Sequence, residues 1–324
     1  MKKLSKNILL ISLFSISLSA CSLLPSPNKN KQSKEESFEN NSSNIKENSS
    51  HFEDEYEPVY DKNSNTVTYG IYPQTAVEDS AIIQALNNIS DSEPCGYVYY
   101  NGNYYYSVTT NHNNFSKLEY YFMSGTRIQS NTNYWFKCDP IVWNVLSKTG
   151  NEFYLLSSTL LDVSRYDKTT TKYAQSSIRE WLNLDFYNKA FFLNDSHVVE
   201  DWIDNSAGGD NASEDTLDKV FLPSLEDYIN PRYGFANETS NSAYEPRCCL
   251  TTDYTRAKGA MLAYAIYSNG NNGYTSSMRD NGFYWTRTPR NSSSVEAILG
   301  NGGVWNDGID IDDDCARPAI RISL

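Results

Sequence analysis

The composition of the chain changes sharply near Pro58, and this change limits where a folded domain can lie. Residues 22–57 contain few apolar side chains and many Ser, Asn, Lys and Glu residues. Such a segment cannot bury enough surface to offset the entropy that is lost when a chain becomes ordered. Residues 58–324 are rich in aromatic and β-branched side chains, and their number suits one large domain. We therefore predict a disordered tether over 21–57 and a folded domain over 58–324.

The first 20 residues have the pattern of a bacterial export signal. Lys2, Lys3 and Lys6 precede the apolar run ILLISLFSISL at 8–18, which is too short to span a bilayer as a mature helix. The next residues, LSAC, end at Cys21 and match the lipobox of bacterial lipoproteins. We predict that residues 1–20 are removed and that Cys21 is acylated, which anchors the protein on the extracytoplasmic face of the cell envelope. The alternative is an ordinary secretory signal with a chance cysteine.

Charge and cysteine content exclude several classes of partner. The formal charge is −13, and loss of the three signal lysines makes it −16, which disfavours nucleic acid and anionic lipid as partners. The membrane is therefore expected to contact the lipid anchor only. The chain has no C-x-x-C spacing and only three histidines, which disfavours a zinc site. Disulfide pairing stays open, because after acylation an odd number of cysteines remains: Cys95, Cys138, Cys248, Cys249 and Cys315.

The spacing of apolar residues predicts few helices and many short strands, an α+β chain with long loops. Helices are predicted at 77–89 and at 176–192, the second beginning with a capping box of Ser177 and Glu180. Asn101-Gly102 predicts a tight hairpin turn within 96–108, and a second hairpin is predicted to turn near Thr149-Gly150. Further short strands are predicted at 66–75, 219–224, 282–289, 295–304 and 315–324.

A set of short motifs resembles an uncharacterised bacterial domain family found in lipoproteins and cell-surface proteins. The motifs are YGIYPQ, GNYYYSV, YWFKCDPIVWNVLS, FYLLSS, SSIREWLN, VFLPS, DYTRAKGA, YWTRTP and ARPAIRI, in this order over about 68–324. The family is similar to the C-type-lectin-like superfamily, which includes the formylglycine-generating enzyme and the variable proteins of diversity-generating retroelements. The resemblance implies a twisted antiparallel sheet, one or two packed helices and a variable loop face. It implies no activity.

The family pattern falls on tryptophans and arginines for which a structural role is expected. The tryptophans are expected to be largely buried, and the arginines to satisfy carbonyls or carboxylates inside the fold. A ligand pocket is the alternative for the arginines. These residues are Trp143, Trp181, Trp285, Arg179, Arg287 and Arg317.

Trp305-Asn306-Asp307 is the tripeptide with which calcium-dependent lectins bind a cation and a sugar hydroxyl. The other half of such a site is missing, because Glu245-Pro246 is followed by Arg247, whose charge would repel a cation. Asp310, Asp312 and Asp314 alternate, so on a strand they would share one solvated face. No glycine or glutamate follows to complete a calcium loop. We therefore predict no metal or cofactor, with a weak extracellular calcium site as the alternative.

No catalytic motif selects a reaction. The chain lacks G-x-S-x-G, S-x-x-K and H-E-x-x-H, and nothing in the sequence selects one pair among its many carboxylates. The favoured interpretation is a non-catalytic surface binding module for a glycan, cell-wall or protein ligand. An extracytoplasmic enzyme of unknown chemistry and a structural envelope protein without a discrete ligand are the alternatives. An aromatic platform beside polar groups predicts the ligand face: Trp285, Arg287, Trp305, Asn306 and Asp307.

Overall fold

The computed structural model describes residues 56–93, 95–116, 118–267 and 269–324. All of these residues belong to one compact unit, Lys46–Leu324. The predicted signal, Cys21 and nearly all of the predicted tether lie outside the described residues. Within the described part of the chain, none of the helices has the length and apolar character needed to cross a membrane.

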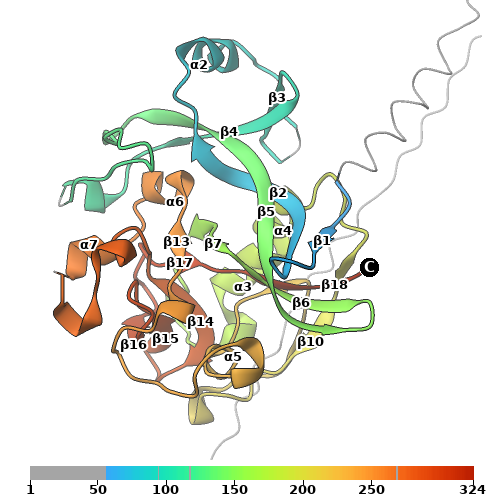
Figure 1. Cartoon of the computed structure of the whole chain (residues 1–324), viewed down its shortest axis with the longest axis vertical. Coiled ribbons are helices and arrows are strands. Elements are labelled where there is room, and N and C mark those ends of the chain that lie inside the picture. Colours follow the sequence, from blue (N-terminus) through green and yellow to red (C-terminus); the bar gives the residue numbers. More distant parts are fainter. Residues whose placement is uncertain (1–55, 94, 117, 268) are drawn as a thin grey trace, which may run out of the picture. The chain divides into compact units, whose positions relative to one another are not determined.

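The larger sheet is built around β5 (Asn133–Thr149), which pairs antiparallel with β2, β4 and β6 (Figure 1). Asn101 and Gly102 have φ angles of 48° and 80°, which confirms the predicted hairpin turn. The second predicted hairpin is also confirmed, with Gly150 at φ 60° between β5 and β6. The other strands of this sheet are β1 (Val59–Asp61), β2 (Thr66–Ala76), β3 (Val98–Tyr100), β4 (Asn103–Thr109), β6 (Glu152–Ser157), β9 (Val198–Val199), β12 (Val220–Phe221) and β18 (Ala319–Ser323).

A second sheet has the strand order β16-β15-β14-β17-β8. The strand predicted over 295–304 is wrong: the chain turns there and forms two strands, because Gly302 at φ 81° allows a tight reversal. The strands are β8 (Asp162–Val163), β14 (Tyr284–Pro289), β15 (Ser294–Ile298), β16 (Val304–Gly308) and β17 (Cys315–Ala316). Two small pairs complete the strands: β10 (Asp201–Ile203) with β11 (Thr216–Asp218), and β7 (Thr159–Leu160) with β13 (Leu250–Thr251).

The helices are few, as predicted, but they are shorter than the ranges 77–89 and 176–192. α2 (Ser80–Asn87) is capped by Asp79, whose carboxylate accepts from two backbone amides of the first turn. The main helical segment consists of α3 (Ser177–Trp181), a π-helical turn over Leu182–Phe186, and α4 (Tyr187–Ala190). The predicted cap at Ser177 is wrong by one residue, because the Ser176 hydroxyl accepts from the amide of Arg179. The remaining helices are α5 (Leu225–Tyr228), α6 (Asp253–Ala257) and α7 (Ala263–Ile266). The predicted α+β class, with mostly antiparallel sheets, is confirmed.

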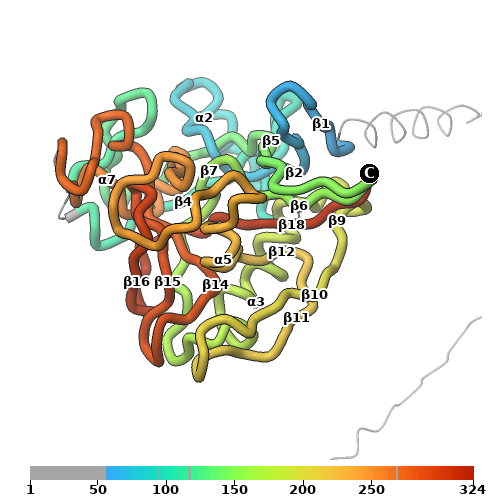
Figure 2. The backbone as a smooth tube through the Cα atoms, turned by 60° about the horizontal axis from the view of Figure 1, so that its bottom comes forward, coloured from blue at the N-terminus to red at the C-terminus, as the bar shows by residue number. Residues whose placement is uncertain are grey.

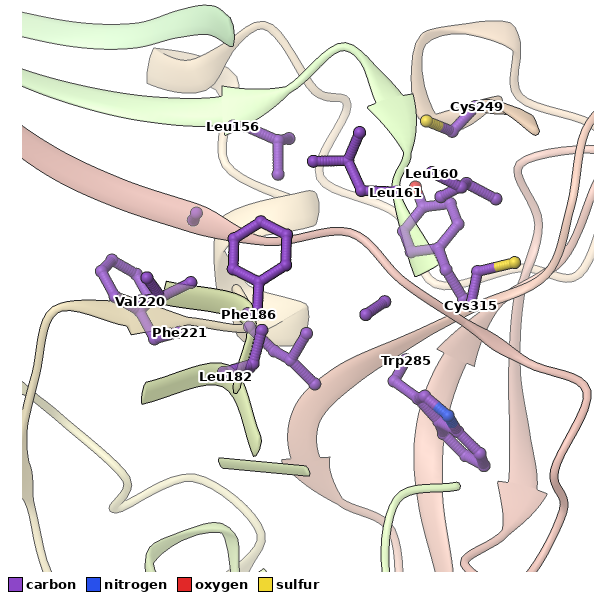
Figure 3. Packing of buried hydrophobic residues seen from close by; sticks show 14 of the residues in the cluster. Leu156, Leu160, Leu161, Leu182, Phe186, Val220, Phe221, Cys249, Trp285 and Cys315 are labelled. Carbon is purple, nitrogen blue, oxygen red and sulfur yellow. The ribbon is translucent and has the colours of Figure 1, made fainter. Parts of the chain in front are cut away.

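The main core lies between the two sheets and the main helical segment. Figure 3 shows Leu182 and Phe186 from this segment in one apolar cluster with Leu156 and Val220. Trp143 and Trp285 are fully buried as predicted, whereas Trp181 is only half-buried.

The predicted structural role of three arginines is confirmed by their contacts. Arg179 pairs with Asp218 at 2.6 Å, and Arg317 donates to the carbonyl of Ser157 at 3.0 Å. Arg287 donates to the carbonyl of Leu222 at 2.8 Å. The five cysteines among the described residues are free thiols.

Candidate functional site

The edge strand β16 directs two of the predicted ligand residues toward one hollow. Trp305 and Asp307 are two residues apart, so their side chains point to the same face of the strand. Trp305 is 47% exposed and Asp307 is half-buried. Asn306 lies between them, pairs with Glu296 of β15, and points to the opposite face. Of the three predicted ligand residues on β16, two therefore face the hollow and Asn306 faces away from it.

The chain after β16 turns inward and places two further aspartates at this hollow. The interpretation of Asp310, Asp312 and Asp314 as one solvated strand face is wrong, because residues 309–314 form turns. The carbonyl of Asp313 accepts from the amide of Met261 at 2.8 Å, and that of Asp314 accepts from the amide of Ser164 at 3.2 Å. These bonds hold Asp314 inside the protein with only 2% of its surface exposed.

The hollow is a cavity of about 430 Å³ with aromatic walls and an acidic floor. Trp305 lines it from β16, Phe283 from the residue before β14, and Tyr267 from the end of α7. Figure 2 shows α7 beside the β15–β16 hairpin. The volume of the cavity lies in the range of sites that bind small ligands. Its other lining residues are Asn241, Met261, Ile266, Asn271, Asn272, Leu299, Asp307, Ile311, Asp313 and Asp314.

The carboxyl groups in the cavity lack a basic partner. Burial raises the pKa of Asp314 well above its usual range, and the negative charges of Asp307 and Asp313 add to this rise. Burial also raises the pKa of Asp307, which interacts directly with Asp314. Asp314 Oδ2 has no hydrogen-bond partner in the described structure. Two carboxyls in direct contact do not both ionise easily, so the pair readily retains one proton.

The rim of the cavity is held by a fully buried asparagine, Asn301. Its side-chain amide donates to the carbonyls of Asn241 at 3.5 Å and Asn272 at 3.3 Å. Its side-chain oxygen accepts from the amide of Gly303 at 2.9 Å. This one side chain therefore joins three loops. Because a Cβ on Gly302 would lie 2.0 Å from the carbonyl oxygen of Tyr244, only glycine allows the loops to approach so closely.

Arg247 reinforces the same rim from inside. Its side chain is fully buried and donates to the carbonyl of Gly302 at 2.7 Å and to that of Glu238 at 2.9 Å. The guanidinium lies 4.5 Å from the centre of the Tyr244 ring. Arg247, whose charge disfavours a lectin-type cation site, therefore has a structural role inside the fold.

The remaining predicted ligand residues, Trp285 and Arg287, lie on the same sheet but are occupied. Trp285, Ala297 and Trp305 are in register on three adjacent strands. Trp285 is 0% exposed and its indole nitrogen donates to the carbonyl of Ser164 at 2.8 Å, so the ring offers no platform at the surface. Arg287 also pairs with Asp227 at 3.2 Å.

Two larger hollows have polar groups that are already paired. In a hollow of about 890 Å³, Tyr187 donates to Asp195 at 2.6 Å and Asn194 donates to Glu57 at 2.9 Å. In a hollow of about 540 Å³, Arg179 is neutralised by Asp218. The cavity beside Trp305 differs because a buried carboxyl oxygen in its wall has no partner among the described residues.

No metal centre is assembled in the described part of the chain. No group of three or more histidine, cysteine, aspartate or glutamate side chains is arranged there to hold a metal ion. Asp312 instead contacts His112 at 3.1 Å and Arg165 at 3.5 Å.

Several cavity residues were not expected from the sequence, namely Tyr267, Asn301, Asp313 and Asp314. A usable signal was present only for Asp314, which directly precedes the apolar pair Cys315-Ala316. An acid next to a buried strand is more often buried than an acid within a polar run. Tyr267 and Asn301 carry no local signal of this kind.

Comparison with known proteins adds one finding. A family model described as a domain of unknown function, DUF6273, matches residues 150–324. This range contains both strands of the β15–β16 hairpin and every residue that lines the cavity. No curated protein and no solved structure matches the chain.

Proposed function

Because the chain belongs to the DUF6273 family of domains of unknown function, its family assigns no activity, and we propose a function from the cavity itself. The protein is a surface binding module, and the cavity beside Trp305 takes a glycan or cell-wall saccharide unit. The observation that carries this proposal is the combination of a half-exposed indole with aspartates that line the same cavity, one of which has a buried oxygen without a partner in the described structure. An exposed aromatic face stacks on a sugar ring, and polar groups at its edge select hydroxyl positions.

The rim supports a saccharide more than a peptide. Asn241, Asn271 and Asn272 line the cavity, and an asparagine side chain can both donate and accept hydrogen bonds. A peptide commonly binds by adding a strand to a free sheet edge. At the edge strand β16 the amide of Val304 already donates to the carbonyl of Ser240 at 2.8 Å. A protein ligand is the alternative outcome of the binding test.

We also propose the cellular address and a finer description of the fold. Acylated Cys21 anchors the module on the extracytoplasmic face of a bacterial envelope membrane, and residues up to 57 act as its tether. The fold is a C-type-lectin-like arrangement. The long twisted sheet, the packed helical segment and the position of Trp305 on an edge strand support this description. A superposition of an experimental structure on C-type-lectin-like domains that fails to align β5, β6 and β18 would reject it.

The binding proposal is tested with the full-length protein, extracted in detergent, on an array of glycans, cell-wall fragments and peptides. The Trp305→Ala variant is expected to lose at least tenfold in affinity, because a stacked tryptophan is among the residues that contribute most to binding. Trp202→Ala is the matched control, because Trp202 is 68% exposed on β10 and does not line the cavity. Equal binding by both variants, or turnover of a wall polymer by the protein, would contradict a non-catalytic module at this site.

Calcium dependence is examined in the same array with a chelator. We expect binding to be unchanged, because the described residues offer no metal-binding group. Chelator-sensitive binding that is lost in Asp307→Asn would instead identify a weak calcium site.

A further inference from the structure

The aspartates in the cavity beside Trp305 have no positive charge among the residues that line it. Asp307, Asp313 and Asp314 contribute three carboxyl groups, whereas no lysine, arginine or histidine lines the cavity. Two other buried acids in the described structure do have such partners: Asp218 pairs with Arg179, and Asp162 pairs with Lys258. An ionised carboxylate away from water is costly unless it is paired. In the free protein the pair of Asp307 and Asp314 therefore avoids this cost by retaining a proton.

One oxygen marks where a donor is missing. Asp313 Oδ2 accepts from the side-chain amide of Asn114 at 2.8 Å, so this carboxyl already has a hydrogen-bond donor. Asp314 Oδ2 is buried and has no partner in the described structure, although Asp314 lines the cavity. Buried polar atoms are nearly always hydrogen-bonded, so an exception in the wall of a cavity leaves room for a donor from a ligand.

The walls of the cavity suit a cation as well as an apolar ring. The ring centres of Tyr267 and Phe283 lie 6.2 Å apart, and the two ring planes are tilted by 34°. Both residues line the cavity together with Trp305. The faces of aromatic rings attract ammonium groups, most strongly where water is excluded. The net charge of −13 also increases the rate at which a cationic ligand approaches.

We propose that the cavity selects a saccharide that carries a free primary amine, with its ammonium group bound between Asp307 and Asp314. This inference rests on the proposed function and adds the chemical class of the ligand. The ammonium donates to the carboxylates of Asp307 and Asp314, while the sugar ring stacks on Trp305. The proton held by the aspartate pair is released to water when the ammonium binds. An N-acetylated sugar lacks the charge and cannot replace that proton.

A metal ion is a poorer occupant of the same place. Calcium takes six to eight oxygen ligands, whereas this cavity has three aspartates, one of them already held by Asn114. A primary amine has three donors, which the two aspartates and one rim amide can accept.

The charged and titratable groups around the pair define the expected pH dependence. Asp313 lies on the same loop, and Tyr267 faces Asp307 from α7. Burial together with the Asp307 charge raises the pKa of Tyr267 to about 12, so this phenol stays neutral near pH 7. Cys315 follows Asp314, and burial keeps its thiol protonated by raising its pKa well above the usual range. His112 and Arg165 contact Asp312 on the outer side of the loop. Ammonium binding should therefore strengthen as the aspartate pair ionises.

The test compares two probes on the full-length protein by isothermal titration calorimetry. The probes are a β-1,4-linked glucosamine trisaccharide with free amines and the same trisaccharide after complete N-acetylation. We expect the free amine to bind at least tenfold more tightly while it is protonated. Asp314→Asn and Asp307→Asn should abolish this preference. Asp310→Asn removes the same charge from an exposed residue of the same loop that does not line the cavity, and should keep the preference.

The outcomes separate the inference from the proposed function. Equal affinity for both probes, or a preference that survives Asp314→Asn, overturns the amine-binding inference and leaves a saccharide site in place. Binding of neither probe overturns the inference, and the glycan array then decides the proposed function. If the protein binds a lysine tripeptide and does not prefer the free-amine trisaccharide over the N-acetylated one, the site binds a protein ligand instead. Thermal melting of each variant shows whether it is folded, so a failure to bind is interpretable.

Discussion

Replacement of Arg247 by methionine tests whether one buried cation holds the loops around the cavity. The methionine keeps most of the volume but removes the donors that satisfy the carbonyls of Gly302 and Glu238. A buried acceptor that loses its partner costs about 1–3 kcal/mol, and a hydrogen bond from a charged donor lies at the upper end of this range. The ion pair with Glu238 adds little, because that carboxylate is 42% exposed. Part of the loss is offset because the buried charge is also removed. We expect unfolding free energy to fall by about 3 kcal/mol.

Urea-induced unfolding followed by far-ultraviolet circular dichroism measures this loss. Arg127→Met is the control, because Arg127 and its partner Glu119 are both more than half exposed and such pairs contribute at most about 1 kcal/mol. Hydrogen exchange at the amides of Tyr244 and Val304 reports the rim directly, since these amides donate to the carbonyls of Asn301 and Ser240. A loss no larger than that of Arg127→Met, with unchanged exchange, would refute the role assigned to Arg247.

Three further predictions address the core, the cavity and the anchor. Trp143→Ala should lower the unfolding free energy by about 3–5 kcal/mol in urea, because it leaves a large void and frees the carbonyl of Tyr69. Asp314→Asn should raise the melting temperature at pH 8 more than at pH 4 in scanning calorimetry. The native pKa of Asp314 is raised, so its stabilising effect is complete below the ordinary value of 3.8 and is lost as pH rises through the native value; an equal effect at both pH values would contradict this. Cys21→Ala should release the protein from the membrane fraction, and retention of unlipidated protein there would reject the anchor.

The sequence predicts those features of the fold that depend on neighbouring residues. Asn101-Gly102 specifies its turn because both residues adopt a positive φ at little cost. The helix beginning near Ser176 was recognisable from a capping side chain and the apolar spacing after it. Two adjacent serines compete for the cap, however, and local sequence does not distinguish them.

The cavity was less predictable because distant contacts determine it. Asp312 and Asp314 belong to the same alternating run of aspartates, yet Asp312 is exposed and Asp314 is buried. Their difference arises because Ser164, 150 residues earlier, binds the backbone of Asp314. Trp285 and Trp305 likewise share a register position on β14 and β16, which flank β15, but only Trp285 is covered. Periodicity indicates a face of a sheet, but it does not indicate which part of that face another loop covers.

The aspartate pair is unfavourable for stability, and this supports a role in binding. An asparagine at 314 would fill nearly the same volume without the cost of a buried negative charge. The neighbouring elements do not compensate this charge, since the described residues that line the cavity include no base. They do, however, hold the carboxyl in place through the backbone bonds of Met261 and Ser164. A chain that positions two interacting carboxyl groups beside an open cavity departs from the rules that otherwise govern its core, and such departures are concentrated at functional sites. The cost in the free protein is recovered when a cation binds, so the ligand itself should raise the stability of the fold.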